Sequence, residues 1–180
     1  MTSFIEHYRD AMRNITGSCP PERTEVRYRL KEQRPGCAVP QALHDFDRLL
    51  DAAGDPDLEI RRRAVMWLVQ PGRWATKAVP TLIKSLADDD DQTKWHAASA
   101  LGEYCEQGYC EGMTDEAVAG LVECLASTPP DTIPLIMRSL SKFGSRASSA
   151  LPALKQLENH ESFLVGTAVA DAILAITKQP

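Results

Sequence analysis

The sequence has no apolar run long enough to cross a lipid bilayer, which takes about 20 consecutive apolar residues. Its first residues, MTSFIEHYRD, also lack the basic start and the apolar stretch that mark a secretory signal. The shares of apolar residues (43%) and charged residues (25%) are ordinary for a globular protein. We therefore expect a cytoplasmic protein without a membrane segment.

Cysteine is too scarce and too scattered for a fold held together by disulfides. The five cysteines are an odd number, and three of them, Cys105, Cys110 and Cys124, lie near one another in the sequence. Their spacing matches no common zinc pattern, and His96 would have to reach them from a helix face. The prediction is reduced thiols, with no metal site and no cofactor.

Motifs for catalysis are absent as well. The four histidines are dispersed, and the chain contains no HExxH, GxSxG, GxGxxG or phosphate-loop pattern. The acidic run Asp88–Asp91 lacks the spacing, central glycine and distal glutamate of an EF-hand. Acidic side chains at the start of a helix interact favourably with the positive end of the helix dipole, and they can cap the first turn. We expect a protein without catalytic residues, in which the acidic run caps a helix.

Charge is unevenly distributed along the chain. The net charge is −5, yet residues 1–77 carry 13 lysines and arginines against 11 acidic residues, whereas residues 78–180 carry 7 against 14. A chain that binds nucleic acid along its length usually has the opposite sign, so nucleic acid is disfavoured as a partner. The densest basic run is Arg61-Arg62-Arg63, and both a salt-bridged surface and a contact with an acidic partner or phosphate fit it.

Three segments share the same internal spacing. They begin at Ala78 (AVP), Ala117 (AVA) and Ala150 (ALP), so the starts are 39 and 33 residues apart. We count offsets from the first alanine of each segment. Each segment has a leucine at offset 4, a small residue at offset 22, a large aliphatic residue at offset 23 and a large apolar residue at offset 26. In chain order these are Leu82, Leu121, Leu154; Ala100, Ser139, Ala172; Leu101, Leu140, Ile173; and Tyr104, Phe143, Ile176. Such a period predicts an all-α solenoid of four to five antiparallel helix pairs.

The units resemble the HEAT-repeat family in its short bacterial form. The resemblance is carried by the Ala-Val/Leu-Pro-x-Leu opening of the first helix, the Asp-rich turn and a second helix of small residues such as HAASALGEY. The stretch Asp55–Leu68 adds an Asp turn followed by the pair Ile60-Arg61, which later units lack. The resemblance covers about residues 38–178. It implies an α-α superhelix whose second helices line a concave face that holds a partner.

We expect one continuous domain. Residues 1–37 are interpreted as an N-terminal helical cap or a degenerate repeat. Residues 38–180 form the repeat domain, with units near 38–76, 77–116, 117–149 and 150–178. Asp55 is expected to cap the helix over residues 58–69, with Pro56 at its first position.

Side chains opposite the core provide the candidate partner-binding residues. If Ala97, Leu101 and Tyr104 face the core, Trp95 and Ser99 point away from it. The equivalent positions in other units, together with the residue one turn after Arg138, complete the set of candidates. These are Arg62, Met66, Trp95, Ser99, Arg138 and Lys142. An exposed tryptophan beside arginine is typical of binding hot spots. Packing of Trp95 against the neighbouring unit fits the pattern equally well.

The last predicted helix, residues 165–177, is apolar all round, and Leu174 faces away from the core side. Terminal repeats usually need a polar outer face. The helix therefore has a partner, such as a second copy of the chain, or a short following element is missing.

Three functions are compatible with the sequence. The leading hypothesis is a non-catalytic protein-binding scaffold, in which Trp95 is the apolar anchor for the partner. Arg62, Arg138 and Lys142 would orient a partner whose surface is acidic or of mixed charge. The second is nucleic-acid binding by the N-terminal basic face, because some helical-repeat proteins similar to this chain act on damaged DNA. The third is a bilin lyase or lyase-associated protein, because some HEAT-like repeats cradle a chromophore.

Overall fold

A computed structural model describes residues 43–69 and 74–178, and within them the secondary structure is entirely helical. The predicted all-α repeat fold is therefore confirmed, with four helix pairs in the described part of the chain. The expected N-terminal cap, residues 1–37, lies outside the described residues. The chain divides into two compact units, one ending at Trp67 and the other beginning at Leu68.

The first unit contains one helix pair, α3 (Leu43–Ala52) and α4 (Leu58–Trp67). The expected cap of α4 is wrong by two residues. The Asp57 carboxylate accepts hydrogen bonds from the main-chain nitrogens of Glu59 (3.0 Å) and Ile60 (3.5 Å), so Asp57 caps the helix. Asp55 instead accepts from the nitrogen of Asp57 at 2.9 Å, which closes a local turn before the helix.

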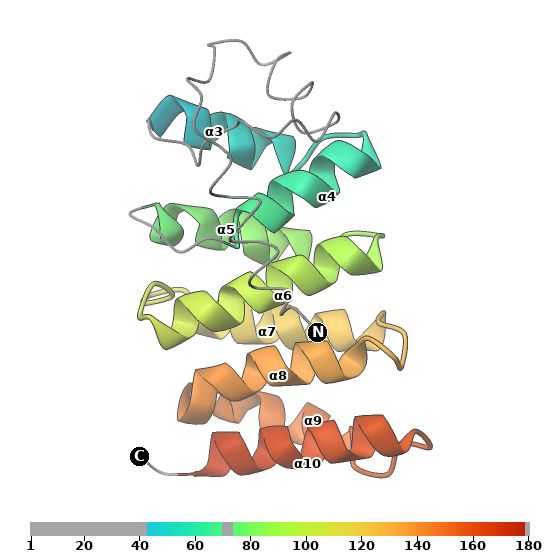
Figure 1. Cartoon of the computed structure of the whole chain (residues 1–180). Coiled ribbons are helices and arrows are strands. Elements are labelled where there is room, and N and C mark those ends of the chain that lie inside the picture. The colour runs from blue at the N-terminus through green and yellow to red at the C-terminus, as the bar shows by residue number, and fades with distance from the viewer. Residues whose placement is uncertain (1–42, 70–73, 179–180) are drawn as a thin grey trace, which may run out of the picture. The chain divides into compact units, whose positions relative to one another are not determined.

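The second unit contains three helix pairs arranged in two layers. One layer holds the first helix of each pair: α5 (Ala75–Ser85), α7 (Thr114–Ala126), and the 3-10 helix η1 (Gly144–Ala150) with α9 (Leu151–Leu157). The other holds the second helices: α6 (Asp91–Glu106), α8 (Ile133–Phe143) and α10 (Phe163–Thr177). Helix α6 packs on α8 and α8 packs on α10, and Figure 1 shows these three helices side by side.

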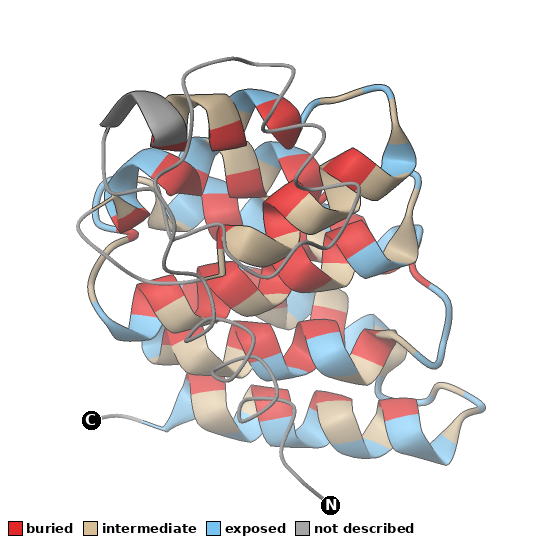
Figure 2. Ribbon diagram, turned by 45° about the horizontal axis from the view of Figure 1, so that its top comes forward, coloured by how far each residue is buried: buried red, intermediate tan, exposed pale blue. Residues whose placement is uncertain are grey.

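The repeated apolar positions form the core of this unit. The leucines at offset 4, Leu82, Leu121 and Leu154, are fully buried, and so are Leu101 and Leu140 at offset 23. Figure 2 shows buried positions recurring along the helices of the stack. The third residue at offset 23, Ile173, is only half-buried, because it belongs to α10 at the edge of the stack.

The first helices begin earlier than their opening motifs suggest. Helix α5 starts at Ala75 and α7 at Thr114, each three residues before the AVP or AVA motif. Pro80 therefore lies inside α5 and not in its first turn. A proline at this position leaves the carbonyl of Thr76 without its helical donor. Both Thr76 and Pro80 are exposed, so water can reach that carbonyl and the helix tolerates the proline.

Candidate partner-binding surface

The acidic turn before α6 sets the start of the helix that carries Trp95. The Asp90 carboxylate accepts a hydrogen bond from the main-chain nitrogen of Thr93 at 2.8 Å and another from its hydroxyl at 2.9 Å. Asp88 accepts from the nitrogen of Asp90 at 2.9 Å. The acidic run therefore caps a helix, as the sequence predicts.

Trp95 and Ser99 lie one turn apart on α6, and both are half-buried. Their neighbours Ala97, Leu101 and Tyr104 are in the core, so the predicted orientation of these three is confirmed. The indole ring of Trp95 lies beside the ring of the largely buried His96, with centroids 4.6 Å apart and planes tilted by 32°. Part of the indole is thus packed and part of it remains accessible.

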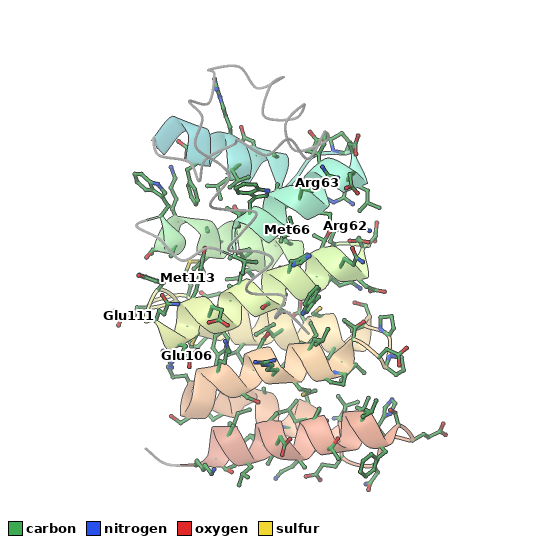
Figure 3. The ribbon with its side chains drawn as sticks, in the orientation of Figure 1. Arg62, Arg63, Met66, Glu106, Glu111 and Met113 are labelled. Atoms are coloured by element: carbon green, nitrogen blue, oxygen red, sulfur yellow. The ribbon has the colours of Figure 1, made fainter. Side chains whose placement is uncertain are left out.

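Lys142 joins α8 to α6. Its ammonium bonds to the carboxylate of Glu103 and lies 3.5 Å from that of Glu106. Figure 3 labels Glu106 near the end of α6. The positive charge of Lys142 is therefore shared between two carboxylates of the same protein, which leaves it less able to attract an acidic partner than the sequence alone suggests.

The other candidate on α8 is Arg138, which is exposed. Leu135 lies three residues before it and exposes 38% of its surface, whereas the other exposed large apolar side chains of the second unit belong to α10. Sequence reasoning missed Leu135 and Glu103. The signal for Glu103 was its place one turn after Ser99 on the same side of α6. We use the name second-helix face for six residues: Trp95, Ser99, Glu103, Leu135, Arg138 and Lys142.

Arg62 and Met66 belong to the first unit, where they lie one turn apart on α4 and are half-buried (Figure 3). The three arginines of the basic run make local contacts. Arg61 donates to the carbonyl of Asp55 at 2.9 Å, Arg63 bonds to Glu59 at 2.6 Å, and Arg62 lies 3.9 Å from the same carboxylate. The structure thus supports a salt-bridged surface for this run.

Three buried cysteines have free thiols. A hydrogen bond with Cys110 lowers the pKa of the Cys105 thiol, and the same bond together with burial raises the pKa of Cys110. Burial also raises the pKa of Cys124. In the part of the chain that the structure describes, no group of three or more histidine, cysteine or acidic side chains could hold a metal ion.

Helix pairs that bury equivalent offsets and pack one after another define an α-solenoid repeat protein. Residues 46–134 match the family model for HEAT repeats. Residues 46–134 are therefore HEAT-like repeats, and the sequence resemblance is confirmed. A search of curated proteins found no match. Within the described residues, no helix is both long enough and apolar enough to span a membrane.

Two solved structures show the same kind of fold. One is a designed armadillo repeat protein in complex with the peptide (KR)4, with a TM-score of 0.61 and 18% identity, covering 73% of this chain. This chain spans 64% of the length of that protein. The other is an engineered protein solved by a structural genomics consortium, with a TM-score of 0.60 and 20% identity, covering 95% of this chain and 72% of its own.

Proposed function

We propose that this protein is a non-catalytic scaffold or adaptor that binds a partner protein on the second-helix face. The observation that carries the proposal is the accessible part of Trp95 together with the exposed Leu135, on two helices that pack against each other. Aromatic anchors surrounded by polar groups are typical of binding hot spots. A designed armadillo protein of similar fold binds a peptide, which supports a protein or peptide as the partner class.

The charges on this face favour a mixed-charge partner over a purely acidic one. Arg138 offers an exposed cation, whereas Lys142 is held between Glu103 and Glu106. A partner that approaches this face meets both signs of charge, so it needs an apolar side chain for the anchor and a carboxylate for Arg138. Arg62 and Met66 of α4 are proposed as partner contacts of the first unit by itself.

Truncation of the anchor tests the proposal directly. Partners are captured from the native host with the full chain and identified by mass spectrometry, and their affinity is then measured by calorimetry. Trp95→Ala should weaken binding by about 2 kcal/mol or more, and Arg138→Ala should weaken it by a smaller amount. Lys155→Ala is the matched control, because Lys155 is exposed on α9 in the other layer. Unchanged affinity of a folded Trp95→Ala variant would remove Trp95 from the site.

The two alternative functions gain no support from the described residues. Nucleic-acid binding requires cations that are available to phosphates, and the arginines at 61–63 already contact acidic or carbonyl groups of their own unit. A titration with duplex DNA at low salt distinguishes this hypothesis, because phosphate binding must weaken steeply as salt is added. The bilin hypothesis is tested by adding a tetrapyrrole and recording its absorbance.

A further inference from the structure

Helix α10 carries an exposed, uncharged seam along its whole length. Its members are separated by steps of four and three residues: Phe163, Thr167, Ala170, Leu174 and Thr177. All five are exposed, and Phe163 and Leu174 expose 80% and 54% of their surfaces. Leu164, next to the seam, exposes 65%. Steps of four and three place side chains on one narrow stripe, as in helices that pack against another helix. We call these five residues the outer seam.

The matching stripe on the earlier second helices is covered by the next helix of the stack. The repeat offsets make Ala98 and Gly102 of α6 equivalent to Ala170 and Leu174 of α10. Ala98 is fully buried, and a Cβ atom on Gly102 would lie 3.1 Å from the Cα atom of Ser139 in α8. On α8 the equivalent of Ala170 is Met137, which is also buried. The centre of the outer seam, at Ala170 and Leu174, thus corresponds to the side of α6 that packs against α8.

In the second unit, α10 lies at the edge of the stack. It contacts α8, η1 and α9, and Figure 1 shows no other labelled helix beyond it. One more helix packed on the outer seam would occupy the place that α8 takes on α6 and that α10 takes on α8. The end of the unit therefore offers a surface that is already shaped for a helix of this same kind.

We propose that the outer seam pairs with the outer seam of a second copy of this chain, with the two α10 helices antiparallel and crossing at Ala170. The small side chain of Ala170 at the crossing allows the two helices to approach closely. Phe163 and Thr177 are each seven residues from Ala170, so the phenylalanine of one copy covers the threonine of the other at both ends. Because the two copies use the same surface, the assembly closes as a dimer.

Charge at the two ends of the helix favours the antiparallel direction. Glu161 precedes α10 and Lys178 follows it, and both are exposed. An antiparallel pair brings Lys178 of each copy beside Glu161 of the other, whereas a parallel pair would bring like charges together. Asp171, beside Ala170, meets its own counterpart near the two-fold axis, so this position opposes association.

The oligomeric state of the full chain tests the dimer. Sedimentation velocity should give a species of twice the 19.8 kDa chain mass, whose fraction rises with protein concentration. Leu174→Glu should raise the dissociation constant about tenfold or more. Leu58→Glu introduces the same change at an exposed leucine of α4, outside the seam, and should leave dimerisation unchanged. A chain that stays monomeric at about 1 mM overturns the proposal, as does a Leu174→Glu variant that dimerises like the wild type.

Charge variants test the antiparallel arrangement independently of folding. Lys178→Glu should weaken the dimer, and adding Glu161→Lys to that variant should restore it. Asp171→Asn should tighten the dimer, because it removes the like charges near the axis. Failure of the double exchange to restore association, or a weaker dimer with Asp171→Asn, would overturn the antiparallel pairing about Ala170.

Discussion

The ammonium of Lys94 in α6 donates a hydrogen bond to the main-chain carbonyl of Ser127, 3.1 Å away, at the end of α7. It also pairs with Asp91 at 2.9 Å, and its side chain is almost fully buried. If Leu68 is aligned with Leu101, both of which are buried, Lys94 is the equivalent of Arg61, which donates to the carbonyl of Asp55. The basic residue is thus kept in both repeats, although each bonds to a different carbonyl.

We predict that Lys94→Met destabilises the protein by about 1–3 kcal/mol, because it leaves the Ser127 carbonyl without its donor and Asp91 without its cation. The free energy of unfolding, measured by urea denaturation, checks this. Lys155→Met serves as the control, since Lys155 is exposed and should change stability by no more than about 0.5 kcal/mol. Equal midpoints for the Lys94→Met variant and the wild type would show that this hydrogen bond contributes nothing.

Gly102 marks the closest approach of α6 and α8. A Cβ atom there would lie 3.1 Å from the Cα atom of Ser139 and 3.2 Å from Cδ of Lys142. We therefore expect Gly102→Ala to destabilise the protein by about 1–3 kcal/mol through overpacking, despite the higher helix propensity of alanine. Thermal unfolding followed by circular dichroism measures the effect.

The control for that substitution is Gly166→Ala in α10. The nearest atom to its added Cβ would be the carbonyl oxygen of Glu158, at an ordinary contact distance of 3.7 Å. Here the gain in helix propensity should prevail and stabilise the protein by up to about 1 kcal/mol. If both alanine variants shifted stability in the same direction, close packing at Gly102 would not be the cause.

The repeated core could be predicted from sequence because burial recurs at constant offsets. Leu82, Leu121 and Leu154 each occupy the same place in their unit, so one orientation argument places all three. The start of α5 was not predictable in this way. Proline usually marks a first helical turn, whereas Pro80 lies inside α5 and is tolerated there because Thr76 and Pro80 are exposed.

Ion pairs between neighbouring repeats were harder to predict than the core. Lys142 was expected to face a partner, yet it bonds to Glu103, 39 residues earlier. That separation equals the distance between the two unit starts, Ala78 and Ala117. Opposite charges that lie one repeat apart in the sequence can therefore indicate an ion pair between neighbouring repeats. Whether the pair forms depends on how closely α6 and α8 pack, and the sequence does not give that distance.

Arg146 links the ends of two second helices. Its guanidinium donates to the carbonyl of Cys105 in α6 at 3.0 Å and to that of Phe143 in α8 at 3.3 Å. The Cys105 carbonyl also accepts from the main-chain nitrogen of Gly108 at 3.1 Å, so Arg146 adds a further donor at a helix end that carries the negative end of the dipole. We predict that Arg146→Ala lowers the free energy of unfolding by about 1–2 kcal/mol. Arg138→Ala, at an exposed arginine of α8, should leave stability within about 0.5 kcal/mol of the wild type. Similar losses in both variants would contradict the specific role of Arg146.

Stability at alkaline pH should depend on Cys124. Burial raises the pKa of this thiol, and the hydrogen bond with Thr128 offsets only part of that effect. The folded protein therefore keeps the proton at a pH where the unfolded chain has already lost it, so stability falls as pH rises above about 8.5. One such group contributes at most about 1.4 kcal/mol per pH unit.

The Cys124→Ala variant isolates this contribution from those of Cys105 and Cys110, whose pKa values move in opposite directions. We expect urea unfolding between pH 7.5 and 10 to show a smaller loss of stability with pH in the variant than in the wild type. The variant should be less stable than the wild type at pH 7.5, because truncation also leaves a small cavity, and the gap should narrow as pH rises. Parallel curves across this range would mean that Cys124 ionises in the folded protein as readily as in the unfolded chain.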